Sequence, residues 1–321
     1  MLKPLPTGRL GAFLCVLASA LASCSGPSPN ATPLTPAAPG AAAKAASSND
    51  LIYAGAQHDI IVYSFPAGLL ETTIKTAASI RGLCTDGKGD VWATATTEGK
   101  SGMSGVVYEV ATKGVTAMSG LTVPDHQIPV NCSYDSKTGN LAVTSYNRRT
   151  FAPEIEVYEN ASGTPATYTS DFIGANPQPA YDDSGDLLVT SGGNVCVELP
   201  YGKQSLVEIT LNETIGGVDH AQWYGKSFAL ESFKKSQNGM EKLNEHIYRL
   251  QISGTTGKII GYTIFHGWIA RDAGQSWIDD NIIVGTPGNL LVFWNYPKGG
   301  KAIKAIHPQF KTQAVTITSS S

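Results

Sequence analysis

The sequence lacks the features that would assign a reaction to it. It has no GxSxG, Walker or HExxH motif. Its basic residues form no run, so nucleic acid is a poor candidate partner. Only 15% of the residues are charged, and no long stretch shows the 3.6-residue period of an amphipathic helix. These absences leave a chain of β-strands without a catalytic signature.

Cysteine is scarce, and its spacing excludes a zinc site. Two of the five cysteines, Cys15 and Cys24, belong to the first 24 residues. The other three are Cys84, Cys132 and Cys196, an odd number without CxxC spacing, which does not indicate a disulfide framework. We interpret them as small buried apolar side chains. An oxidising compartment would also allow a bridge between Cys84 and Cys132.

The longest apolar run, residues 11–22, has only twelve residues, which is too short for a membrane-spanning helix. It follows the basic residues Lys3 and Arg9, as the apolar core of a secretory signal does. Residues 21–26, LASCSG, resemble the lipobox of bacterial lipoproteins. The resemblance implies cleavage after residue 23 and lipidation of Cys24. The alternative is an ordinary signal peptide with an incidental cysteine.

A lipid on Cys24 would make the membrane a partner of the protein, because each buried methylene contributes roughly 0.8 kcal/mol. The next residue is Ser25 rather than the Asp that retains family members in the inner membrane, so the resemblance implies the outer membrane where one exists. Residues 24–48 are rich in Pro, Ala, Ser and Thr and predict a disordered tether. The predicted parts are therefore a signal peptide (1–23), a tether (24–48) and a folded domain (49–321).

The folded part carries a repeated turn followed by an alternating apolar strand. DGKGD (86–90), DSKTGN (135–140) and DDSGD (182–186) precede VWAT, LAVT and LLVT. Asp and Gly at these positions are typical of tight turns, whereas a calcium loop needs more carboxylates. With three weaker copies, the repeats end at positions 50, 90, 140, 186, 226 and 281. A period in the forties predicts a β-propeller.

We predict an all-β, six-bladed β-propeller of four-stranded antiparallel blades. The first unit lacks its inner strand. Residues 313–318, QAVTIT, form an additional predicted strand after the last unit. Pairing this strand beside 51–55 would close the ring and remove its free edges. Residues 49–321 resemble propellers of the NHL-repeat and gluconolactonase-like families. Gluconolactonase-like enzymes bind a metal through Glu, Asn and Asp, and no Glu begins the matching inner strands here.

The candidate site lies at the mouth of the central channel. The connections 96–105, 146–153 and 232–245 differ most between units, and variable loops on a rigid scaffold collect binding residues. Connections to the inner strands reach the channel on the same face. They carry the candidate ligand-binding residues Arg81, Asp125, His126, Gln178, Asp219, His220, Arg271 and Asp272.

Two Asp-His pairs appear equivalent in the third and fifth units. These pairs, Asp125 with His126 and Asp219 with His220, allow two interpretations. In the first they form a metal or acid–base centre with His126 and His220 as ligands. In the second each Asp caps the start of an inner strand and each imidazole packs between blades. An arginine at the mouth can hold a carboxylate with two hydrogen bonds or pair with a neighbouring Asp.

These patterns favour a monomeric binding module for a small ligand, glycan or protein, without a cofactor. The alternative is a metal-dependent hydrolase or lyase, with a divalent metal at the channel mouth. A third reading, a structural envelope protein, requires a channel plugged by apolar side chains. Fold alone does not choose among them.

Overall fold

The computed structural model describes residues 50–99, 102–111, 114–117, 121–233, 245–266 and 274–318. The predicted signal peptide, the tether, Cys24, Arg271 and Asp272 lie outside these ranges. The described residues are almost all in strands and turns, and their one helix is a 3-10 turn, Glu159–Ala161. No helix in these ranges is long and apolar enough to cross a membrane.

Four of the five sheets are four-stranded and antiparallel. The first contains β24 (Thr312–Thr318), β1 (Leu51–Ala56), β2 (Asp59–Ser64) and β3 (Leu70–Lys75). The second contains β4 (Ser79–Thr85), β5 (Val91–Gly99), β6 (Gly102–Ala111) and β7 (Gly114–Ala117). The third contains β8 (Gln127–Tyr134), β9 (Leu141–Asn147), β10 (Pro153–Tyr158) and β11 (Ala166–Tyr168). The fourth contains β19 (Ser276–Asp279), β20 (Ile282–Gly285), β21 (Leu291–Asn295) and β23 (Lys304–Ile306).

The fifth sheet has eight strands, because one long strand is shared. Its members are β12 (Gln178–Tyr181), β13 (Leu187–Thr190), β14 (Gly192–Leu199), β15 (Val207–Tyr224), β16 (Ser227–Phe233), β17 (Glu245–Ser253), β18 (Thr256–His266) and β22 (Gly300–Lys301). β15 pairs with β14 along its first part and with β16 along its last part. The all-β, propeller-like arrangement of antiparallel sheets is confirmed. Hydrogen bonding does not divide it into six separate blades.

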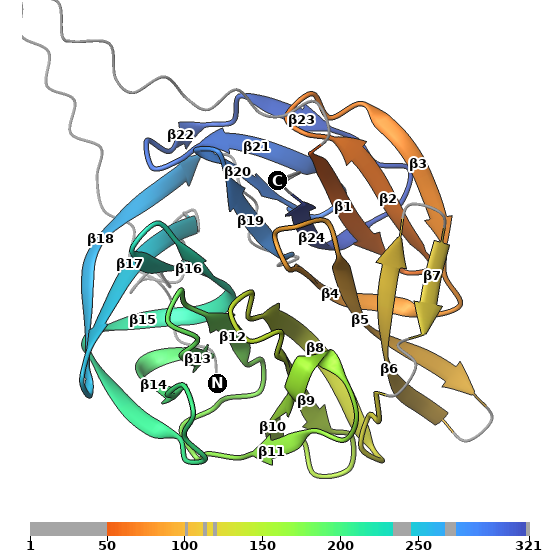
Figure 1. The fold of residues 1–321 in the computed structure, drawn as a ribbon. Helices are drawn as coiled ribbons and strands as arrows, with labels where there is room; N and C mark the ends of the chain where they lie inside the picture. Colours follow the sequence, from red (N-terminus) through yellow and green to blue (C-terminus); the bar gives the residue numbers. More distant parts are fainter. Residues whose placement is uncertain are drawn as a thin grey trace, which may run out of the picture. The chain divides into compact units, whose positions relative to one another are not determined.

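The sheets follow one another around a ring (Figure 1). The strands nearest its axis are β24, β4, β8, β12, β15 and β19, which contact one another in this order, and β19 contacts β24. β24 pairs antiparallel with β1 from Leu51↔Thr318 to Ala56↔Thr312. The predicted closure of the ring by the C-terminal strand is therefore confirmed.

The repeated turns have the local chemistry that the sequence predicts. In the turn between β4 and β5, Asp86 Oδ1 accepts hydrogen bonds from the backbone N–H groups of Lys88, Gly89 and Asp90, at 2.7, 3.0 and 3.0 Å. Gly87 and Gly89 have φ angles of 71° and 123°, which L side chains rarely adopt. Asp86 is thus occupied in holding the turn. The predicted loop 96–105 is mostly strand, since β5 and β6 extend to Gly99 and from Gly102.

The core lies between neighbouring sheets, so both faces of a strand are buried. In β2, Ile60 and Val62 pack toward β4–β6, whereas Ile61 and Tyr63 pack toward β20 and β21. All four residues are buried, and each fully buried apolar side chain of this size contributes roughly 1.5–3 kcal/mol. This two-sided packing explains the uninterrupted apolar runs in the sequence.

The preferred reading of the cysteines is wrong for two of the three. Cys84 in β4 and Cys132 in β8 form a disulfide, with their Cα atoms 5.7 Å apart. Cys196 is a free, buried thiol, as predicted. The bridge joins two strands that approach each other only because the ring brings them together at its axis. A separation of 48 residues in the chain gives no sign of that proximity.

Candidate functional site

Three of the strands around the axis carry a bulge. Arg81 in β4, Val130 in β8 and Asp219 in β15 are each the extra residue where the register with the next strand shifts. A bulge bends its strand and redirects a side chain. Arg81 and Asp219 are thus structurally equivalent.

The bulges overturn the predicted equivalence of the two Asp-His pairs. His220 follows the bulge of β15, and the residue that follows the bulge of β8 is Asn131. Asp125 and His126 precede β8. Asp125 is exposed, and the carbonyl of His126 accepts the backbone N–H of Arg148 at 2.9 Å. The sequence pattern matched the two pairs wrongly, because a bulge shifts the register of a strand and leaves no marker in the sequence.

Buried polar side chains meet on the axis below the mouth. Gln275, just before β19, donates from Nε2 to the Leu83 carbonyl at 2.7 Å and accepts at Oε1 from the Leu83 N–H at 3.1 Å. Its Nε2 also lies 3.4 Å from Asn131 Oδ1 and 3.3 Å from His220 Nδ1. Asn131 Nδ2 donates to Gln178 Oε1 at 2.5 Å. Among the described residues, the side chains that bridge the axis are polar.

His220 belongs to this buried network. It is 3% exposed, and burial lowers the pKa of its imidazole to about 3. Its ring centroid lies 5.6 Å from that of Trp277. Burial, followed by the charge of Glu231, raises the pKa of Asp219 to about 8. Both groups are therefore mainly neutral at pH 7.

The described ranges contain no group of three or more His, Cys, Asp or Glu side chains that could hold a metal ion. A metal centre at His126 and His220 would need ligands from elsewhere in the chain. The predicted residues Arg271 and Asp272 lie in one of the undescribed ranges.

The mouth itself is a cavity of about 380 Å³ around Arg81. Its lining comes from β4, β8, β9 and β24 and from the residues just before β12 and β24: Arg81, Val130, Tyr146, Ala175, Asn176, Lys311, Thr312 and Gln313. Arg81 is exposed and forms no ion pair within the described ranges. The described lining contains two cationic side chains and no acid. Arg81 lies at this cavity, whereas Gln178 belongs to the buried network.

The other end of the axis is acidic and aromatic. A cavity of about 300 Å³ is lined there by residues of β4, β8, β12, β15, β19 and β24, with Asp86, Asp182, Trp223 and Trp277 among them. Asp86 and Asp182 accept backbone hydrogen bonds in their own turns. The sequence predicted these carboxylates as turn residues, and this role accounts for them.

Sequence reasoning missed a fully buried carboxyl group in the third sheet. Glu156 in β10 is 0% exposed, and burial raises its pKa to about 7. Ser145 Oγ lies 2.8 Å from Glu156 Oε1 and 3.1 Å from Gln127 Oε1, yet a hydroxyl has only one proton to donate. A protonated Glu156 donates its own proton to Ser145 Oγ. The Ser145 hydroxyl can then donate its proton to Gln127 Oε1. The network is thus complete when Glu156 is neutral.

Replacing Glu156 with Gln is expected to remove part of the pH dependence of stability. The folded protein keeps this proton up to about pH 7, whereas the unfolded chain releases it near 4.5. The stabilisation from Glu156 is therefore complete below pH 4.5 and falls as the pH rises through 7. At pH 8, Glu156→Gln should be more stable than the wild type by roughly 2–3 kcal/mol, and at pH 4 about equal. Urea denaturation at both pH values measures this, with Glu109→Gln, an exposed carboxylate in β6, as control. Equal pH dependence in wild type and Glu156→Gln would contradict the assignment.

Known proteins resemble this chain in fold only. No family model matches the sequence, and no curated protein matches it. Solved structures share the fold. One is a protein of unknown function from Bacteroides caccae, with a TM-score of 0.51 and 10% identity, covering 84% of this chain and 98% of that one. Another is a functionally unknown protein from Desulfotomaculum acetoxidans, with a TM-score of 0.50 and 9% identity, covering 84% and 99%. At these identities the likeness concerns architecture, so function must be inferred from the site.

Proposed function

We propose that this chain is a lipid-anchored, extracytoplasmic β-propeller that binds a small carboxylate-bearing ligand at the channel mouth. The leader and the lipobox-like residues before Cys24 support the anchor and an outer-membrane location. A disulfide between Cys84 and Cys132 fits an oxidising compartment outside the cytoplasm. The chain carries no catalytic motif, which favours binding over turnover.

We propose that this propeller has six blades. The eight-stranded sheet then contains two blades, one from β12 to the first part of β15 and one from the last part of β15 to β18. The order of contacts among the strands at the axis supports this count. So do the bulges at Arg81, Val130 and Asp219, which recur at the same depth of three of these strands. Six such blades would match the NHL-like propellers that the sequence resembles.

The position of Arg81 carries the proposal for the ligand. A bulge holds its backbone, and its guanidinium is exposed beside a cavity of about 380 Å³, a size typical of small-molecule sites. A planar guanidinium with two parallel donors matches a carboxylate, and such charge-assisted pairs are stronger than neutral hydrogen bonds. Asn176, Thr312 and Gln313 line the same cavity and offer further donors.

Arg81→Ala is expected to abolish most carboxylate binding. Calorimetric titration of the purified chain with succinate and with citrate tests this. Loss of the guanidinium removes a charge-assisted pair of about 1.5–3 kcal/mol, so affinity should fall roughly 10- to 100-fold, whereas Arg81→Lys should keep part of it. The matched control is Lys88→Ala, which removes an exposed cation from the turn between β4 and β5. Equal affinities in the wild type and Arg81→Ala, or no binding of either acid, would refute the proposal.

A further inference from the structure

A second site lies far from the mouth, in a cleft between neighbouring sheets. A cavity of about 630 Å³ is bordered by the turns β8–β9 and β12–β13 and by the connections β10–β11 and β14–β15. A second cavity, of about 430 Å³, continues from it along β11 to the start of β15. Thr167, Tyr168 and Gln204 line both. The two cavities together form an elongated cleft, which we call the outer cleft.

Aromatic rings are spaced along the outer cleft. Tyr201 and Phe172, at 55% and 49% exposure, belong to the first and second cavities respectively, and Tyr168 is common to both. Tyr181 is buried beneath the first. Large exposed aromatic side chains cost free energy in water unless something covers them. Because these rings lie along one cleft, they suit a ligand that presents several apolar faces along its length.

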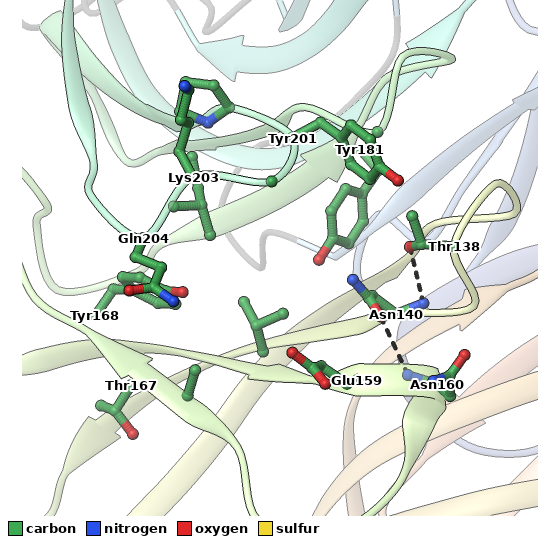
Figure 2. Close-up of a pocket in the computed structure, with 16 residues that line it drawn as sticks. Thr138, Asn140, Glu159, Asn160, Thr167, Tyr168, Tyr181, Tyr201, Lys203 and Gln204 are labelled. Atoms are coloured by element: carbon green, nitrogen blue, oxygen red, sulfur yellow. Dashed lines mark hydrogen bonds between the residues drawn. The ribbon is translucent and has the colours of Figure 1, made fainter.

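Uncharged polar groups fill the spaces between the rings. Asn140, Asn160, Gln204, Thr138 and Thr167 face the first cavity, which Figure 2 shows together with Tyr168, Tyr181 and Tyr201. Amides both donate and accept hydrogen bonds, and hydroxyl groups do the same. The side chains of Asn160, Gln204 and Thr167 can therefore bind an alcohol in either direction. The Thr138 hydroxyl already donates to Asp135, and Asn140 Oδ1 already accepts from the backbone of Asn160, which leaves the Asn140 amide N–H groups as donors.

The walls of the outer cleft are held in place before any ligand arrives. Asn140 Oδ1 accepts the backbone N–H of Asn160 at 3.1 Å, which ties the β10–β11 connection to the β8–β9 turn (Figure 2). The Tyr201 N–H donates to Asp186 Oδ1 at 2.6 Å, and Lys137 Nζ lies 4.4 Å from the centre of the Tyr201 ring. Preorganised walls lower the entropic cost of binding.

From these features we propose that the outer cleft binds a linear, neutral oligosaccharide. The C–H faces of pyranose rings stack on aromatic rings, whose faces carry partial negative charge, and sugar hydroxyls match amide and hydroxyl side chains. The charged lining residues are Lys203, Glu159 and Glu208. One cation and two anions give the cleft no net positive charge, so it does not attract a polyanion. A peptide added as a strand would have only the three-residue edge strand β11 to pair with, and so few backbone hydrogen bonds.

The test is calorimetric titration of the full chain with cellohexaose, maltohexaose, xylohexaose and chitohexaose. At least one should bind, and Tyr201→Ala and Tyr168→Ala should each weaken it about tenfold, the loss typical of an important aromatic contact. Tyr201→Phe keeps the ring and should bind like the wild type. The matched control is Tyr262→Ala on β18, since Tyr262 is also 55% exposed but lies outside the cleft.

The outcomes separate this proposal from the one for the mouth. Arg81→Ala should leave saccharide binding unchanged, and Tyr201→Ala should leave succinate binding unchanged. Failure of all four hexasaccharides to bind at millimolar concentration would overturn the saccharide proposal. Binding that Tyr201→Ala and Tyr262→Ala weaken equally would overturn it too, as would a peptide ligand that depends on Tyr201.

Discussion

A chain that ends at residue 311 is expected not to fold. The deletion removes β24, which pairs with β1 on one side and contacts β4 and β19 at the axis. It takes away the buried side chains of Ala314, Val315 and Ile317 and exposes the edge of β1. The two larger side chains alone contribute roughly 3–6 kcal/mol, and the lost strand pairing adds to this. Since domains are stable by only about 5–15 kcal/mol, the ring should not survive.

Circular dichroism melting and the soluble yield measure the effect of this deletion. The control ends at residue 318 and keeps all of β24. The truncated chain should show no cooperative melt, whereas the control should melt like the full chain. A cooperative transition within a few degrees of the control would mean that the ring does not depend on the pairing of β24 with β1.

Removing the disulfide is expected to cause the second largest loss of stability. Cys84 and Cys132 enclose a separation of 48 residues, and cross-linking a loop of that length restricts the unfolded chain by about 4 kcal/mol. Cys84→Ala with Cys132→Ala should therefore lower the free energy of unfolding by about 3–5 kcal/mol. Guanidinium denaturation of the oxidised wild type and the double variant gives this difference.

Cys196→Ala is the matched control for the double replacement, because Cys196 is equally buried but forms no bridge. It deletes one sulfur atom from the core and should cost only about 1 kcal/mol. If the double variant loses no more than twice what Cys196→Ala loses, the bridge contributes nothing beyond the packing of its sulfur atoms.

The architecture could be predicted because its signals are local. The turn at Asp86 requires only a carboxylate followed by Gly. Closure by residues 313–318 followed from counting strands. The merging of two predicted units into one eight-stranded sheet was not predictable, because β15 continues from one partner strand to the next without a turn.

The candidate site was only partly predictable, because its features depend on which strands become neighbours. The bulges that place Arg81 at the mouth and His220 in the buried network leave no mark in the sequence. Glu156 looks like a solvent-facing residue of an alternating strand, but neighbouring sheets cover both faces of β10. The outer cleft joins residues of two sheets, so no single stretch of sequence contains it.

Both proposed sites use side chains that the scaffold holds rigidly, and they differ in chemistry. The mouth offers positive charge at the axis, and the outer cleft offers aromatic rings and amides at the periphery. A lipid-anchored protein with two such sites would hold a small acid and a saccharide independently.

A crystal structure of the chain grown with saturating succinate tests the central claim, that the mouth binds a carboxylate through Arg81. The account predicts a succinate carboxylate within hydrogen-bonding distance of the Arg81 guanidinium, about 2.7–2.9 Å, in the cavity that Asn176 and Gln313 also line. An empty mouth, or succinate bound elsewhere with Arg81 pointing away, would contradict it.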